Sequence, residues 1–168
     1  MGNSRPASYS ALLESLDSSF KFSYLRFSPL TRAGNVQKFF EHSLEKVKGT
    51  SYAPKDHKKM IFFIDDVNLN KKEAYGAHPS LELMRQYLEH QGWYNLDTNT
   101  MMKVSNASFF CSANPNRGCK DAFSNRFKRH FNILAPVSAS EEELSTMFST
   151  VLASRLASHN PTLQKFRG

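Results

Sequence analysis

The sequence predicts an α/β fold built around a mainly parallel β-sheet. Two apolar runs of strand length, over residues 59–66 and 107–113, are continuous and end in polar residues, which is typical of strands buried on both faces of a parallel sheet. Segments with apolar residues at helical spacing alternate with these runs, and such alternation favours an α/β architecture. The longest apolar run covers only residues 60–64, well short of the roughly 18 residues that cross a membrane.

The first half of the chain predicts the order helix, strand, helix, strand. Residues 8–16 and 35–47 each place apolar side chains on one helical face, the second with Gly49 as its stop signal. Between them, residues 22–27 alternate in polarity and are rich in aromatic residues, which indicates a strand. The run over residues 59–66 is the fourth element and reads KMIFFIDD.

The second half continues the alternation and ends in a separate helical segment. The predicted elements are a helix over residues 79–91, a hairpin or loop over 93–104, a strand over 107–113, a short helix over 121–129 and a short strand over 131–134. Ser140 and Glu143 then form a capping-box pattern that opens a last helix. We expect residues 1–136 to form the α/β core and residues 137–168 to begin a helical lid.

Polar side chains follow both buried strands at the point where each strand ends. Asp65 and Asp66 end the first strand, and Asn114 follows the second. Ligands of α/β sheets gather at the carboxyl ends of the strands. A carboxylate held there can bind Mg²⁺ that bridges nucleotide phosphates, a neighbouring acid can orient the attacking water, and an amide can contact the γ-phosphate. Each pattern is also typical of an ordinary turn.

The chain is basic, with a formal net charge of +7 and a pI of about 9.5. The basic residues are spread along the chain except for one concentration, made of Arg117, Lys120, Arg126, Lys128, Arg129 and His130. Three interpretations of the segment 125–131 are open: a nucleic-acid patch, a helix C-terminus whose cations complement the dipole, and a cation supplied to a nucleotide on a neighbouring subunit. The two cysteines and the histidines lack zinc-type spacing.

The sequence resembles the third AAA+ module of dynein heavy chains. Residues 62–95 contain residues of the family's motifs in the family's order, namely Asp65, Asp66, Asn68, Tyr75, Gly76, Pro79, Met84, Arg85, Gln86, Gly92, Trp93 and Tyr94. Residues 125–134, NRFKRHFNIL, resemble a second family segment. The resemblance runs from about residue 10 to 157, and the Asp-Asp ending is more similar to axonemal than to cytoplasmic heavy chains.

The resemblance implies roles for individual residues. Asp65 would coordinate Mg²⁺ in the Walker B position and, with Asn114, contact ATP. Asp66 would occupy the catalytic-acid position, Asn114 would be the sensor, and Arg126 or Arg129 would act on the nucleotide of a neighbouring module. The implied partners are neighbouring AAA+ modules, dynein subunits and microtubules, in the cytoplasm and cytoskeleton or in a ciliary axoneme. No membrane partner is implied.

One departure from the family pattern is large. No GxxxxGK[ST] phosphate-binding loop occurs in the sequence, and we expect the chain to begin after that loop and the strand before it. The core would then be an incomplete version of the three-layer AAA+ fold. Without the amides and lysine of the loop, little would remain to hold the phosphates. We therefore expect a fragment of a dynein motor ring that binds neither ATP nor Mg²⁺ by itself. The alternatives are a non-enzymatic AAA+-like scaffold domain and, less favoured, a basic nucleic-acid-binding domain.

Overall fold

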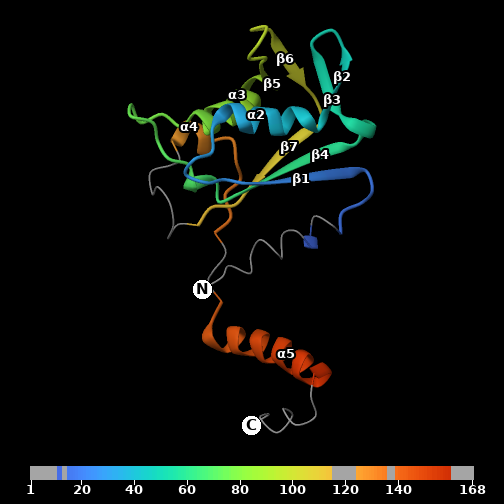
Figure 1. The fold of residues 1–168 in the computed structure, drawn as a ribbon, viewed down its shortest axis with the longest axis vertical. Helices are drawn as coiled ribbons and strands as arrows, with labels where there is room; N and C mark the ends of the chain where they lie inside the picture. Colours follow the sequence, from blue (N-terminus) through green and yellow to red (C-terminus); the bar gives the residue numbers. More distant parts are fainter. Residues whose placement is uncertain (1–10, 13–14, 115–123, 136–138, 160–168) are drawn as a thin grey trace. The chain divides into compact units, whose positions relative to one another are not determined.

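The computed structural model describes residues 11–12, 15–114, 124–135 and 139–159. The chain divides into two units, Met1–Asn132 and Ile133–Gly168. The first unit is built on a parallel three-stranded sheet with the order β1-β4-β7 (Figure 1). Its strands are β1 (Phe20–Arg26), β4 (Lys59–Asp65) and β7 (Ala107–Cys111). The expected α/β fold with a parallel sheet is confirmed.

Two helices cover one face of this sheet (Figure 1). Helix α2 (Ala33–His42) follows β1, and helix α3 (Pro79–His90) follows β4. Their buried side chains form a single core with the facing residues of β4, with its partly buried neighbours on β7 and with Trp93. The core is mainly aromatic, and it includes Phe40, Phe62, Tyr87, Trp93 and Phe109, whose rings lie 4.7–5.8 Å from their neighbours. Large aromatic rings bury much apolar area per residue, so this cluster holds the two helices on the sheet.

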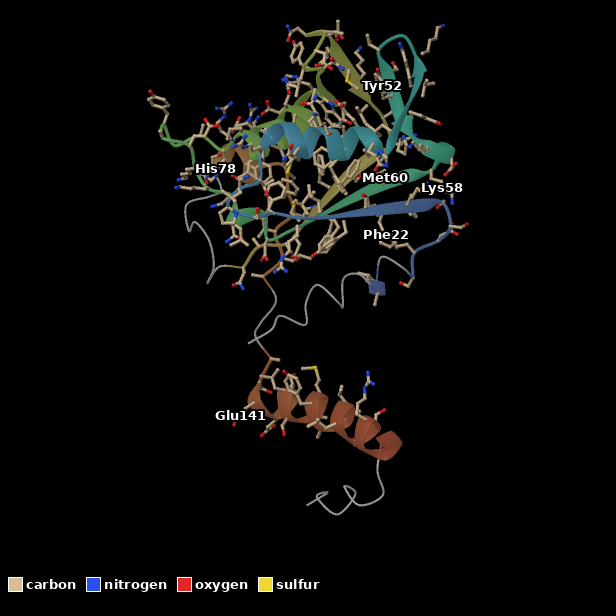
Figure 2. The ribbon with its side chains drawn as sticks, viewed as in Figure 1. Phe22, Tyr52, Lys58, Met60, His78 and Glu141 are labelled. Carbon is tan, nitrogen blue, oxygen red and sulfur yellow. The ribbon has the colours of Figure 1, made fainter. Side chains whose placement is uncertain are left out.

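The opposite face of the sheet carries partly exposed aromatic side chains. Phe22, Tyr24 and Phe110 are each about two-fifths exposed, and the ring centroids of Tyr24 and Phe110 lie 5.4 and 5.3 Å from that of Phe63. Figure 2 shows Phe22 turned away from the helices, whereas Met60 of the neighbouring strand belongs to the core. The helix predicted over residues 8–16 falls mostly outside the described residues; only residues 11 and 12 of it are described as helical.

A second, four-stranded sheet has the order β2-β3-β6-β5. Its strands are β2 (Leu44–Lys48), β3 (Ser51–Pro54), β5 (Gly92–Tyr94) and β6 (Met101–Val104). The antiparallel β5–β6 pair confirms the hairpin that was one alternative for residues 93–104. The connections in the first unit also contain two short 3₁₀ helices, η1 (Lys55–His57) and η2 (Val67–Leu69).

The predicted helix over residues 35–47 is wrong in its second half. Helix α2 ends at His42, and residues 44–48 form β2. The apolar residues Leu44 and Val47 fit a helical face by spacing, but Leu44 pairs with Pro54 of β3, and Val47 lies at the irregularity between the paired residues Lys46 and Lys48. Gly49 has a φ of 55°, which a hairpin turn requires and glycine tolerates. It therefore turns the hairpin rather than stopping a helix.

The predicted strand over residues 131–134 does not form. Residues 131–135 are irregular, and Ile133 and Leu134 are 69% and 87% exposed. Within the described part of the chain, β7 pairs with β4 on one side and with no strand on the other. A short strand has no stability without a partner strand to accept its backbone hydrogen bonds. The apolar pattern alone is therefore insufficient here.

The second unit contains helix α5 (Glu141–His159). Its start has the predicted capping box, because the Ser140 amide donates to Glu143 Oε2 at 2.9 Å and the Glu143 amide donates to Ser140 Oγ at 3.2 Å. The apolar residues of this helix are exposed, namely Leu144, Met147, Phe148, Val151 and Leu152. None of the described helices is both long and apolar enough to pass through a lipid bilayer.

Candidate functional site: an acidic strand end held by the neighbouring strands

Asp65 is the last residue of the central strand β4, and its carboxylate is enclosed by the two neighbouring strands. The hydroxyl of Tyr24 on β1 donates to Asp65 Oδ2 at 2.7 Å. The hydroxyl of Ser112, directly after β7, donates to the other oxygen, Oδ1. Asp65 is only 2% exposed. Both carboxylate oxygens are thus engaged by groups of this chain, as a buried charge requires.

Asp66 turns the backbone away from the strand and forms the ion pair of the site. Its φ of 52° lies in the left-handed region, which is unusual for a residue with a side chain. Its Oδ2 accepts from Arg26 Nη2 at 2.9 Å and from Arg26 Nε at 3.2 Å. Arg26 Nε also lies 3.8 Å from Asp65 Oδ2. One guanidinium therefore faces two buried carboxylates, while its own side chain is 59% exposed.

The register of the sheet explains this arrangement. Tyr24 and Arg26 pair with Phe63 and Asp65 across parallel strands. Paired residues of neighbouring strands point to the same face of the sheet. Tyr24 and Arg26 therefore lie on the same face as Phe63 and Asp65. Tyr24 and Arg26 were given no role from the sequence. The strand prediction identified the alternation, but strand neighbours and their register are not visible in one sequence.

The ends of β4 and β7 lie side by side, as the sequence predicts for parallel strands. Val67 N donates to Ser112 O at 3.0 Å, and Asp66 N donates to Ser112 Oγ at 3.2 Å. Asn68 Nδ2 donates to Asn114 O at 2.8 Å, and Asn114 N donates to Asn68 Oδ1 at 3.2 Å. This reciprocal pair fixes the backbone of Asn114 beside the acidic strand end. The role of Asn114 as a sensor stays a prediction.

The electrostatics of the site favour the charged form of Arg26 and the neutral form of Tyr24. Burial of the Tyr24 hydroxyl and its hydrogen bond to Asp65 raise the pKa of Tyr24 to about 12. The hydrogen bonds to Asp66 raise the pKa of Arg26 above its ordinary value. Tyr24 is therefore a hydrogen-bond donor at every physiological pH. Arg26 is a permanent counter-ion.

The described residues do not fit a Mg²⁺ ion in this arrangement. Mg²⁺ takes octahedral oxygen ligands and usually binds through one or two carboxylates, water and substrate phosphates. Both oxygens of Asp65 already accept from hydroxyl groups, and Asp66 holds Arg26. No group of three or more metal-binding carboxylates, histidines or cysteines occurs among the described residues. Metal binding at Asp65 would require these contacts to open first.

The basic segment lies against helix α3. Helix α4 (Asn125–Lys128) is one turn long and confirms part of the helix predicted over residues 121–129; residues 121–123 lie outside the described residues. Phe127 is buried in the core, and its ring lies 4.9 Å from that of Phe131. No hydrogen bond or ion pair within the described residues links this segment to the acidic strand end.

The two candidate arginines of this segment differ in their surroundings. Arg129 Nη2 donates to Glu89 Oε1 of helix α3 at 2.6 Å. Arg126 is exposed and makes no hydrogen bond or ion pair with a residue that the structure describes. Glu89 was not identified from the sequence, where it is one of several acids on a helix surface. Of the wider concentration of basic residues, Arg117 and Lys120 lie outside the described residues.

Comparison with known proteins gives a consistent family assignment. Residues 1–138 match the family model of the P-loop containing dynein motor region. Human dynein axonemal heavy chain 1 is 34% identical over 146 residues, which is 86% of this chain and 3% of that protein. Rat dynein axonemal heavy chain 12 is 34% identical over 82% of this chain and 4% of its own length. Human dynein axonemal heavy chain 17 is 32% identical over 86% of this chain and 3% of its own length.

Proposed function

The chain belongs to the dynein heavy chain family, and we propose that it forms part of an AAA+ module of a motor ring, the third module, and does not bind Mg·ATP by itself. It spans about 3–4% of the length of the curated relatives that it matches. ATP-driven movement on microtubules, a place in a ciliary axoneme, and contacts with neighbouring AAA+ modules and dynein subunits are accordingly proposals. They come from the axonemal dynein heavy chains that it is similar to.

The observation that carries the proposal is the engagement of both strand-end carboxylates by the chain itself. Tyr24 and Ser112 occupy the two oxygens of Asp65, and Arg26 is the counter-ion of Asp66. A guanidinium near two acids supplies the positive charge that Mg²⁺ would otherwise supply. The 168 residues also contain no GxxxxGK[ST] loop. This chain therefore lacks the donors that hold the β- and γ-phosphates in P-loop proteins.

Within an intact module we assign the acidic strand end to the nucleotide. Asp65 would hold Mg²⁺ once Tyr24 or Arg26 moves away, Asp66 would act as the catalytic acid, and Asn114 would contact the phosphates. The reciprocal hydrogen bonds between Asn68 and Asn114 support this assignment, because they hold the two strand ends at a fixed separation. An aspartate in the catalytic-acid position has a shorter reach than glutamate. We therefore expect hydrolysis in this module to be slow or its nucleotide to be regulatory.

Calorimetry with the 168-residue chain tests the proposal. We expect no heat of binding when Mg·ATP is titrated to millimolar concentration into the chain, while circular dichroism shows that it is folded. A second titration uses Mn²⁺ as a paramagnetic substitute for Mg²⁺, with Arg26→Met as the variant that removes the counter-ion. We expect the variant to bind Mn²⁺ more tightly than the wild type. Micromolar Mg·ATP binding by the wild type, or equal Mn²⁺ affinity of both chains, would contradict the proposal.

A second candidate function is a non-enzymatic AAA+-like interaction domain. The observation that favours it is the partly exposed aromatic face of the sheet, with Phe22, Tyr24 and Phe110. Exposed apolar patches commonly mark surfaces that contact another protein segment. The two functions differ in one measurement: the ATPase rate of a heavy chain that carries this segment falls on Asp66→Asn if the site is catalytic and stays constant if the segment is a scaffold.

A further inference from the structure

One carboxylate near the end of helix α3 is surrounded by cationic side chains from two elements. Glu89 accepts from Arg85 Nη1 of its own helix and from Arg129 Nη2, directly after α4, at 2.6 Å. The ring of His130 approaches the same carboxylate, with Nε2 at 3.4 Å from Oε1. His90 Nε2 lies farther away, 4.0 Å from Oε2. Glu89 thus connects two segments that are 40 residues apart in the chain.

The contact is partly buried and electrostatically strong for a surface group. Glu89, Arg85 and His130 are all less than one-fifth exposed, whereas Arg129 is 61% exposed. The hydrogen bond from Arg85 first, and then that from Arg129, lower the pKa of Glu89 to about 2. Charge-assisted hydrogen bonds of this kind are shorter and stronger than neutral ones. Glu89 is therefore ionised at neutral pH and can accept from both arginines.

Helix α4 needs such an anchor because it is a single turn of four residues. An isolated helical turn is unstable, since nucleation fixes several dihedral angles for one hydrogen bond. The described contacts that hold α4 include the hydrogen bond from Phe127 N to the Ser124 hydroxyl at 3.3 Å, the burial of the Phe127 ring in the core, and the bond of Arg129 to Glu89. The last of these is the contact that joins α4 to α3 by charge.

We propose that Glu89 is a positioning residue, which holds Arg129 and His130 as an anchor so that Arg126 is the cation that α4 presents to a phosphate group on a partner. The guanidinium of Arg129 is bound to Glu89, whereas Arg126 and Lys128 of α4 are exposed and have no ionic partner among the described residues. Of these two cations, Arg126 is the one whose planar guanidinium can bind a phosphate through two hydrogen bonds. The inference rests on the proposed function in one respect, the assignment of the basic segment to a neighbouring module. The inference also assigns different roles to Arg126 and Arg129, which the sequence did not distinguish.

The chain offers a matched control for the anchor. Glu82 accepts from Arg85 Nε at 2.7 Å but makes no hydrogen bond or ion pair with the described residues of α4. Glu82→Gln and Glu89→Gln therefore remove the same charge and disturb the same arginine, and only the second disconnects α4. We expect hydrogen–deuterium exchange of residues 125–131 to accelerate in Glu89→Gln and not in Glu82→Gln, with Glu89→Asp giving partial protection. Equal exchange of this segment in the two glutamine variants would overturn the anchor.

A second measurement identifies the presented cation, with inorganic triphosphate as the probe at low ionic strength. In the wild-type chain, we expect Arg126→Gln to weaken triphosphate binding about threefold, a factor in the range of exposed ion pairs, and Arg129→Gln to weaken it less. In the Glu89→Gln background, Arg129 is released, and we expect the two substitutions to become equivalent. An Arg129→Gln effect equal to or larger than that of Arg126→Gln in the wild-type chain would overturn the assignment of Arg126.

These results are distinguishable from a failure of the proposed function. The exchange experiment reads only the contact between α3 and α4 and does not depend on nucleotide. The triphosphate experiment compares two arginines in one folded chain. A chain that bound Mg·ATP would contradict the proposed function and leave both of these comparisons valid.

Discussion

Removal of the Tyr24 hydroxyl gives a direct test of how the acidic strand end is held. Tyr24→Phe deletes one oxygen atom and leaves the ring that lies 5.4 Å from Phe63 in place. The deleted hydroxyl is the donor to Asp65 Oδ2 at 2.7 Å. Asp65 is almost completely buried, so its carboxylate loses a donor that water replaces only in part. The substitution should therefore destabilise the folded chain without changing its apolar packing.

The magnitude follows from the two ends of the hydrogen bond. A hydrogen bond to a charged group contributes about 1.5–3 kcal/mol to stability. Tyr24, the donor of this bond, is 43% exposed, so solvent screening reduces the contribution of the bond to stability. Asp65 also keeps the hydrogen bond from Ser112. We expect Tyr24→Phe to lower the free energy of unfolding by about 1–1.5 kcal/mol at pH 7.

The same hydrogen bond predicts how this difference changes with pH. The folded chain raises the pKa of Tyr24 from 10.0 to about 12, so the folded state binds the phenolic proton more tightly than the unfolded state. The stabilisation from this raised pKa is fully present below about pH 10 and is lost as pH rises from about 10 to 12. The wild type and Tyr24→Phe should therefore become closer in stability over that range.

Urea unfolding followed by circular dichroism at pH 7 and at pH 11 measures both effects, with the fluorescence of Trp93, the one tryptophan of the chain, as a second probe at pH 7. Tyr75→Phe is the control, since Tyr75 is 99% exposed and should change stability by less than about 0.5 kcal/mol. A Tyr24→Phe variant as stable as Tyr75→Phe at pH 7 would refute the view that Tyr24 holds Asp65 in solution.

Two further predictions concern packing and reactivity. A Cβ atom at Gly92 would lie 2.0 Å from Met102 O, which would force the β5–β6 pair apart, so Gly92→Ala should cost at least about 3 kcal/mol in urea unfolding, the upper end of overpacking costs. Gly34→Ala, where the nearest atom is 3.9 Å away, should be neutral or stabilising by up to about 1 kcal/mol. Desolvation raises the pKa of Cys111, which is only partly buried, to about 12, so in a Cys119→Ser background a thiol reagent at pH 8 should modify Cys111 more slowly in the folded chain than in urea; equal rates in the two states would contradict this prediction.

Much of the main sheet could be predicted because its strands have a local signature. The runs that became β4 and β7 are continuous, apolar and end in polar residues, and parallel strands buried on both faces produce that pattern. Their carboxyl ends lie at one edge of the sheet by topology, so the fold class places Asp65 and Asn114 at the same edge. Only the structure shows that β4 and β7 are neighbours and that Asn68 is bonded to Asn114.

The failures share a different cause, the dependence of short elements on distant partners. Leu44 and Val47 satisfy a helical spacing, but pairing with β3 decides that they belong to a strand. Ile133 and Leu134 satisfy a strand pattern, but the described residues provide no neighbouring strand for them. Local pattern is a weak guide wherever tertiary contacts override propensity. The roles of Tyr24 and Arg26, the side chains that hold the site, could not be predicted for the same reason, since they depend on strand register.

The acidic strand end and the end of helix α3 differ in how completely their charges are balanced. At the acidic strand end, Asp65 and Asp66 face one guanidinium, that of Arg26, so a negative charge remains uncompensated there. At the end of α3, Glu82 and Glu89 face Arg85 and Arg129, so the charges of these four side chains balance. Arg26 thus neutralises only part of the charge of the acidic strand end, and its own side chain is exposed to solvent. The salt dependence of the Arg26→Met variant follows from this argument, because its acidic strand end should attract divalent cations strongly at low ionic strength and weakly when salt screens the site.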